Sequence, residues 1–306
     1  MIPVYYIGKR TLLDILHSGV FWGALVIAGL ACFVILYVGF RHAMEEPNPG
    51  PRHHRGQQQQ FDGSGDPDES PDLRTMPIGN PDPKDTVLWF VYAATIGFSN
   101  LLAIFIMIGL LSRDIENHRI DIILARPVSR GQIYFGKLFG GWISLAIFMA
   151  LMAAWTLVCM LLSGMGAQPK YFNALYVGLL SPFLISALTL LMSIWMKGIL
   201  AGLLGTVMTF AAGNFGTFII SWLGIEILKL DKVVFVLHRI LPPLNVIGSE
   251  ATTYLHTDLN MRLMMEVFES ALPKDPGLYT AMWQVWVYFA VIVILGWLSL
   301  FRRQFT

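Results

Sequence analysis

Six long apolar runs limit what this chain can fold into. Each has roughly 20 residues or more, the length that a helix needs to cross the hydrocarbon core of a bilayer. In lipid, every backbone N–H and C=O group must be bonded within the protein, so runs of this length predict membrane-spanning helices. The predicted spans cover about residues 20–40, 87–111, 134–162, 172–195, 199–223 and 279–301.

The composition supports this assignment. Of the 306 residues, 55% are hydrophobic and 13% are charged, whereas a soluble domain usually carries about 25% charged residues. Cys32 and Cys159 both fall inside apolar runs, so we expect them to pack as small hydrophobic side chains without a disulfide framework. We therefore predict an all-α membrane protein, with one six-helix transmembrane domain over residues 1–306.

The first 18 residues mix apolar and charged side chains, which predicts an amphipathic helix in the membrane interface. A cleaved signal peptide is the alternative, but the run that follows is too long for a signal sequence and no small-residue cleavage pattern closes it. The predicted apolar face consists of Leu12, Leu13, Ile15 and Leu16, opposite Lys9, Arg10 and Asp14.

Two longer segments interrupt the apolar runs. Residues 41–85 are rich in Pro, Gly, Gln and acidic residues and poor in apolar ones, which predicts a flexible external loop. Residues 224–278 alternate apolar and charged stretches around Pro242-Pro243. We expect this second segment to form short external or re-entrant helices before the last span.

The most charged ordered-looking stretch lies at residues 113–137, between the second and third spans. Its first half has a helical apolar pattern, and Pro127 is expected to end that helix because proline lacks an N–H group. Ser129 precedes Gln132 by three residues, a capping-box spacing that predicts the start of a new helix. On composition alone, this stretch is also compatible with a solvated cytoplasmic loop.

The distribution of Lys and Arg predicts the orientation. Short, basic segments lie on one side of the six predicted spans, namely the N-terminus, residues 113–137, Lys197 and the tail at 302–306. The loops on the other side are long and rich in acidic residues. We therefore predict a multi-pass protein of the cell inner (plasma) membrane with both termini in the cytoplasm.

The charged stretch resembles a signature of the type-2 ATP-binding-cassette permeases, the membrane subunits of many bacterial export systems. In that family, a Glu near the end of the second span is followed by a helix ending in Leu-Leu-(Ser/Ala)-x-Pro-(Val/Ile)-Ser-Arg, and then by Gly-Lys. The matching residues are Glu116, the Ile-Leu-Ala-Arg-Pro-Val-Ser-Arg sequence at 123–130, and Gly136-Lys137. The interfacial helix, the six spans and the long external segment before the last span match the family layout as well.

The resemblance implies that two permeases, either two copies of this chain or this chain and a sister, form an export pathway driven by a separate soluble ATPase. A short cytoplasmic helix within 113–130 would rest in a groove of that ATPase. ATP and Mg would bind to the ATPase, and no cofactor, metal or nucleic acid is expected on this chain. The predicted ATPase-coupling residues are Glu116, Arg119, Ile123, Leu124, Arg126, Pro127, Ser129, Arg130 and Lys137.

Motifs for chemistry are missing from the sequence. Gly136-Lys137 lacks the upstream glycine and the following Ser or Thr of a phosphate-binding loop. There is no His-Glu-x-x-His zinc pattern and no Gly-x-Ser-x-Gly nucleophile elbow. We therefore expect the chain not to be an enzyme.

Polar and small residues within the spans are candidates for a substrate pathway or a subunit interface. Polar groups in membrane helices are costly and often functional, but they also form hydrogen bonds between packed helices. Small residues let helices approach closely, either between subunits or within one. The candidates are Ser99, Asn100, Gly205, Gly213 and Asn214.

Two functions fit the sequence. The first is the permease subunit of an ATP-driven exporter. The alternative is a membrane scaffold or assembly factor that uses the same ATPase to work mechanically on an external partner through residues 41–85 and 224–278. A membrane-embedded enzyme would need a catalytic constellation that the sequence does not contain.

Overall fold

The computed structural model describes residues 2–45, 83–116, 128–164, 166–223, 243–255 and 278–302. All secondary structure in these ranges is α-helical, which confirms the predicted all-α membrane protein. The helices are α1 (Ile2–Leu16), α2 (Gly19–Glu45), α3 (Pro83–Glu116), α5 (Arg130–Leu162), α6 (Pro169–Gly178), α7 (Leu180–Trp195), α8 (Gly198–Leu223), α11 (Leu244–Leu255) and α13 (Leu278–Arg302).

Within the described residues, five helical stretches are long and apolar enough to cross a membrane. The sixth predicted run, 199–223, coincides with α8, and its Gly198–Phe210 part is a shorter apolar helix. The total of six spans therefore remains a prediction. The five stretches are Gly19–Gly39, Lys84–Leu111, Arg130–Leu162, Pro169–Trp195 and Trp283–Arg302.

Several helices extend beyond the predicted limits. Residues 41–45 complete α2 and residues 83–85 begin α3, so the ends of the predicted 41–85 loop are helical. Residues 46–82 lie outside the described part. α3 has 34 residues and is therefore about 51 Å long, which exceeds the roughly 30 Å hydrocarbon thickness of a bilayer.

The predicted fourth span, 172–195, is divided at Leu179 into α6 and α7. Pro182 lies in the first turn of α7. Because proline has no N–H group, it cannot donate to the carbonyl of Gly178, the residue four positions earlier. The backbone of Leu179 stays near helical values, so the interruption is a local break in one apolar stretch.

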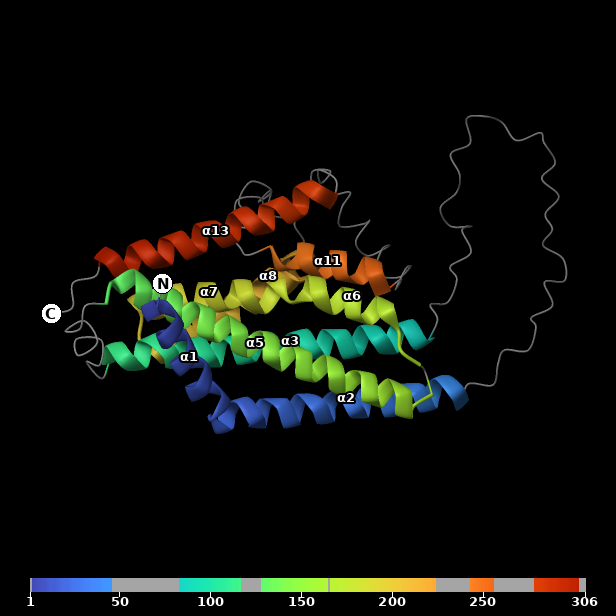
Figure 1. Cartoon of the computed structure of the whole chain (residues 1–306). Helices are drawn as coiled ribbons and strands as arrows, with labels where there is room; N and C mark the ends of the chain where they lie inside the picture. The colour runs from blue at the N-terminus through green and yellow to red at the C-terminus, as the bar shows by residue number, and fades with distance from the viewer. Residues whose placement is uncertain are drawn as a thin grey trace, which may run out of the picture.

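The helices form an elongated bundle in which α2, α3, α5, α7 and α13 run lengthwise, as Figure 1 shows. We call the end of this bundle where α3 and α13 end and α5 begins the basal end. α1 crosses the first turns of α5 there, and α2 also starts at this end. The described beginning and end of the chain, at Ile2 and Arg302, therefore both lie at the basal end.

The turn between α1 and α2 is fixed by local hydrogen bonds. The Ser18 hydroxyl donates to the carbonyl of Ile15 at 2.7 Å, and its oxygen accepts from the N–H of Phe21 at 3.3 Å. The Trp22 indole reaches back to the carbonyl of Leu16 at 2.8 Å. These contacts set α1 at an angle to α2, so that α1 lies against α5.

Only one helix of the predicted 224–278 segment is described, namely α11, which begins directly after Pro243. It packs against α6 and runs beside it rather than across the end of the bundle (Figure 1). Its buried side chains repeat at helical spacing, which explains why this short helix packs with one face inward. They are Leu244, Ile247, Ala251 and Leu255.

Candidate functional site: the basal end of the bundle

The predicted coupling residues are only partly within the described structure. Glu116 is the last residue of α3. Ser129, Arg130 and Lys137 lie at the start of α5. The other predicted coupling residues, Arg119, Ile123, Leu124, Arg126 and Pro127, lie in 117–127, outside the described residues.

The predicted capping box at the start of α5 is confirmed. The Ser129 hydroxyl accepts from the backbone N–H of Gln132 at 3.3 Å, and the Gln132 side chain accepts from the N–H of Ser129 at 2.9 Å. These reciprocal bonds satisfy two of the N–H groups that every helix leaves open at its start. They fix the residue at which the chain enters α5.

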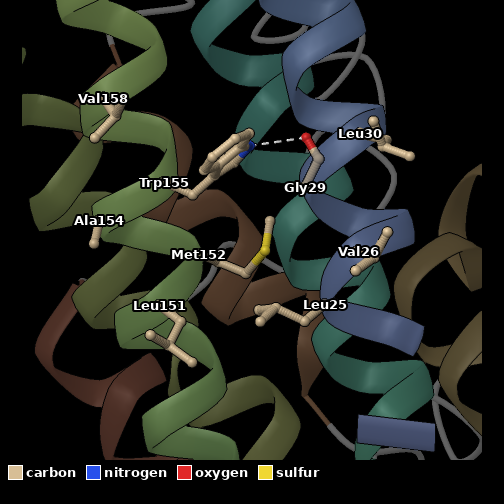
Figure 2. A pocket seen from close by; sticks show the side chains of 9 residues that line it. All are labelled: Leu25, Val26, Gly29, Leu30, Leu151, Met152, Ala154, Trp155 and Val158. Carbon is tan, nitrogen blue, oxygen red and sulfur yellow. Dashed lines mark hydrogen bonds between the residues drawn. The ribbon is translucent and has the colours of Figure 1, made fainter. Parts of the chain in front are cut away.

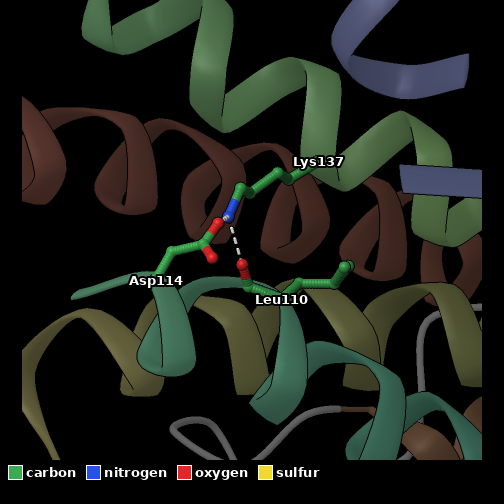
Figure 3. A network of polar contacts seen from close by, with 3 residues as sticks. All are labelled: Leu110, Asp114 and Lys137. Carbon is green, nitrogen blue, oxygen red and sulfur yellow. Dashed lines mark hydrogen bonds and ion pairs between the residues drawn. The ribbon is translucent and has the colours of Figure 1, made fainter. Parts of the chain in front are cut away.

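Lys137 lies in the second turn of α5 and points toward the end of α3. Its ammonium group donates to the carboxylate of Asp114 and to the backbone carbonyl of Leu110, as Figure 3 shows. The side chain of Lys137 is 6% exposed and that of Asp114 is 21% exposed. Asp14 of α1 is also within electrostatic reach of Lys137. The predicted coupling residue Lys137 is therefore buried between helices of its own chain.

Arg130 joins the start of α5 to the end of α13. One of its guanidinium nitrogens donates to the carbonyl of Phe301 at 3.2 Å and lies 3.5 Å from that of Leu300. The last carbonyls of a helix have no intrahelical partner, and they carry the negative end of the helix dipole. Arg130 thus caps α13 at the basal end.

Two glycines of α5 let α1 approach it closely. A Cβ atom on Gly140 would lie 2.8 Å from both the carbonyl oxygen of Gly8 and the Cβ of Thr11. A Cβ on Gly136 would lie 2.7 Å from Ile7. The spacing Gly136-x-x-x-Gly140 therefore forms a flat face on which the backbone of α1 rests.

The buried face of α1 includes Ile15 of the predicted apolar face but not Leu13. Gly8, Thr11 and Ile15 are buried, whereas Leu13 is 44% exposed. Leu12 and Leu16 of the predicted apolar face are half-buried, so Leu13 is the residue of that face that points away from the bundle. Exposed Leu13 remains available for the apolar part of the interface.

At other contacts of α5, a glycine on one helix again lies opposite a large side chain on the other helix. Gly141 leaves room for Met107 of α3, and Gly131 leaves room for the Trp297 indole of α13. In return, the buried ring of Tyr134 fills the space beside Gly296 of α13. The first three turns of α5 therefore contact α1, α3 and α13 on different sides.

The opposite end of α3 carries a second lysine–carboxylate pair. Lys170 at the start of α6 donates to Asp85 in the first turn of α3. Here the lysine side chain keeps 28% of its surface exposed. At about 1.5 Å per residue, Asp85 and Asp114 are about 43 Å apart along α3, so the two pairs lie near opposite faces of a bilayer.

The predicted pathway candidates form hydrogen bonds within the chain where they are described. The Ser99 hydroxyl donates to the carbonyl of Thr95 at 2.7 Å and lies 2.8 Å from the sulfur of Met149. Asn100 accepts from the hydroxyl of Ser181 at 3.1 Å. Ser99 and Asn100 are both buried, so these bonds link α3 to α5 and to α7.

The predicted small residues of α8 also lie against the chain itself. Gly205 is buried, and a Cβ there would be 3.0 Å from the Thr189 hydroxyl of α7. Gly213 and Asn214 belong to α8, but their side-chain surroundings lie outside the described structure. The described part of this helix thus uses its glycines to pack within the subunit.

An apolar groove of about 480 Å³ runs between α2 and α5, as Figure 2 shows. The Trp155 indole donates to the carbonyl of Gly29 at 3.0 Å across this groove. None of the predicted pathway residues lines it. The lining residues are Leu25, Val26, Gly29, Leu30, Leu151, Met152, Ala154, Trp155 and Val158.

A comparison with known protein families agrees with the helical membrane fold. A family model described as ABC-2 family transporter protein matches residues 6–303, nearly the whole chain. No curated protein matches the sequence. The match includes α1, the helices that meet at the basal end, and α13. The chain is therefore a member of the ABC-2 transporter family, whose members are the transmembrane permease components of ATP-binding-cassette transporters and not their ATPases.

Proposed function

We propose that this chain is the permease subunit of an ATP-driven exporter and that it works as a dimer with a second copy or a sister permease. A separate soluble ATPase binds the segment 113–130 and supplies the work of ATP hydrolysis. ATP and Mg are held by that ATPase, and this chain catalyses no reaction. The family membership supports the permease role.

The observation that carries the proposal is the arrangement of α5 at the basal end. The start of α5 is fixed by the Ser129 cap, bonded to α13 through Arg130, and bonded to α3 through Lys137. A displacement applied where the chain enters α5 would therefore reach three membrane helices together. Allosteric and transport proteins use such rigid-body motions of packed elements.

We further propose that the basal end faces the cytoplasm of a cell inner membrane. Ile2 and Arg302 lie at the same end of the bundle as the helix ends that flank 117–127. An even number of membrane crossings brings both termini to one side. The predominance of Lys and Arg in the short segments at this end supports a cytoplasmic location.

Co-expression with its ATPase tests the proposal. We expect the two proteins to co-purify, and the complex to hydrolyse ATP faster than the ATPase alone. The double substitution Arg126→Glu/Pro127→Gly is expected to abolish this stimulation while leaving the permease folded in detergent. If this variant kept wild-type assembly and stimulation, the coupling role of 113–130 would be rejected.

Reconstitution in vesicles distinguishes the exporter from the scaffold. ATP-dependent movement of any solute across the vesicle membrane supports the exporter. Full ATPase stimulation without movement of lipid, peptide or sugar cargo would support the mechanical scaffold instead. Labelling of single cysteines at the termini from each side of the membrane tests the orientation independently.

A further inference from the structure

Lys137 is a cation buried within a membrane-spanning helix, and such groups are costly unless they are paired. Its two acceptors, the Asp114 carboxylate and the Leu110 carbonyl, belong to residues four positions apart. On a helix, residues four apart lie one above the other on the same face. The ammonium group therefore holds one specific turn of α3, close to the end of that helix (Figure 3).

The position of this contact along the chain allows it to transmit force between α3 and α5. The chain leaves α3 at Glu116 and enters α5 at Arg130. Asp114 lies just before this connection and Lys137 lies just after it, so their ion pair joins α3 and α5 next to the connection. The ends of α3 and α5 are thus linked twice, once covalently through the polypeptide and once through the ion pair.

An apolar contact at this position would not fix how α3 and α5 are aligned along their axes. Apolar side chains remain in contact when two helices slide along each other, because dispersion contacts have little direction. An ammonium group between two oxygens fixes the axial register, since a slide of one turn, about 5.4 Å, would leave a buried charge without its partner. Beside the ion pair, Gly141 of α5 leaves room for the Met107 side chain of α3, so the two helices also pack against each other there.

We propose that Lys137 is a positioning residue that locks the ends of α3 and α5 into one unit. The lock makes both helices move together when force is applied to the connection between them. Lys137 therefore acts inside the permease and does not itself contact the ATPase. This inference rests on the proposed function for its biological meaning, but the lock is a property of the isolated permease and can be tested there.

The decisive variant is Lys137→Met/Asp114→Asn, which removes both charges of the pair and leaves nearby only the carboxylate of Asp14, which is exposed. Replacing a buried ion pair by neutral groups is often tolerated, so this variant is expected to fold. The matched control is Lys170→Met/Asp85→Asn, which removes the pair at the other end of α3. Lys137→Arg keeps the positive charge and its donors, and is expected to retain most of the wild-type behaviour.

The first measurement is the distance between spin labels on Phe105→Cys in α3 and Phe139→Cys in α5, in a Cys32→Ala/Cys159→Ala background. Phe105 and Phe139 are both exposed and in the basal half of their helices. We expect a narrow distance distribution in the parent and the control, and a broadened or shifted one in Lys137→Met/Asp114→Asn. An unchanged distribution in the latter would overturn the lock, whatever the ATPase does.

The second measurement is the ATPase stimulation of the assembled complex. Residues that carry coupling typically change it by roughly two- to thirtyfold, and we expect a loss in this range for Lys137→Met/Asp114→Asn at unchanged assembly. The control and Lys137→Arg should stay close to wild type. Normal stimulation in the neutral variant would overturn the lock, whereas lack of stimulation in the wild type would reject the proposed function alone.

Discussion

An aspartate forms an ion pair at each end of α3, but the two pairs differ in how deeply the lysine is buried. Each end has an aspartate paired with a lysine from another helix, Asp114 with Lys137 at the basal end and Asp85 with Lys170 at the other. The basal lysine is almost completely buried, and its ammonium group is also bonded to a backbone carbonyl. The other lysine remains partly exposed.

The packing around glycines also differs between the two ends of the bundle. Around Lys137, Gly136 and Gly140 let the backbone of α1 approach α5, and Gly141 leaves room for the Met107 side chain of α3. After the far end of α5, Gly164 and Gly166 adopt positive φ angles, and a Cβ atom on either would meet no neighbour within 4 Å. Close contacts between backbones therefore hold α1 against α5 at the basal end, whereas the turn after α5 at the other end needs glycine for its backbone conformation and not for close packing.

The largest expected difference between the ends comes from removing one lysine. Lys137→Met leaves Asp114 as a largely buried carboxylate without its partner, which should lower the free energy of unfolding by about 3 kcal/mol. Lys170→Met also leaves a carboxylate without its partner, since Asp85 is only 14% exposed, but Asp85 lies in the first turn of α3, where the positive end of the helix dipole stabilises it, so we expect a smaller loss of about 1–2 kcal/mol. Titration with SDS in mixed micelles measures both, and equal losses would contradict the comparison.

A smaller difference is expected for glycine substitutions. Gly140→Ala would press a methyl group against the backbone carbonyl of Gly8, and overpacking of this kind costs about 1–3 kcal/mol. At Gly178 the nearest atoms belong to the side chains of Ile96 and Tyr92, which can move. Gly178→Ala should therefore lower the thermal midpoint in detergent less, and the opposite order would show that α1 is not held tightly.

The cap of α5 gives the next effect. Ser129→Ala removes the side-chain oxygen that accepts from Gln132, and loss of such a cap costs about 1 kcal/mol. Ser129→Asp keeps an acceptor and should retain the stability of the wild type. Hydrogen exchange at the first turn of α5 measures the local effect, and equal protection in both variants would exclude a stabilising cap.

The smallest effect is expected in the middle of the bundle, between its ends. Ser181→Ala removes the donor to Asn100, and hydrogen bonds between membrane helices contribute about 0.6 kcal/mol on average. A slight fall in the SDS midpoint is therefore expected, without a change in ATPase stimulation. A large loss of stimulation in this variant would instead point to a pathway role for Asn100.

Features set by neighbouring residues were predictable from the sequence. The apolar runs gave the helices to within a few residues, and the Ser129–Gln132 spacing gave the start of α5, because both signals depend on local geometry. The break at Leu179 was missed. Proline at position 182 is compatible with a straight, tilted or broken span, and only its packing decides between them.

The partners within the candidate site could not be predicted in the same way. Lys137 could pair with any nearby acid, and choosing Asp114 requires the relative rotation of α3 and α5. The Gly136-x-x-x-Gly140 spacing, which the sequence analysis did not single out, is compatible with close helix packing, but it does not say that α1 is the helix packed there. Which residues of α1 face α5 also depends on the rotation of α1: Ile15 is buried and Leu13 is exposed although both are apolar.

The spacing of the two aspartates on α3 has a consequence for the lipid environment. Asp85 and Asp114 are about 43 Å apart along α3. Neither ion pair can move into the hydrocarbon without a large cost in free energy, so the two pairs fix which length of α3 lies in the bilayer. In vesicles of longer-chain lipids, α3 cannot compensate for hydrophobic mismatch by sliding, so the bilayer itself must thin around the protein. The activity of the complex should therefore be highest at one acyl-chain length and fall on either side of it.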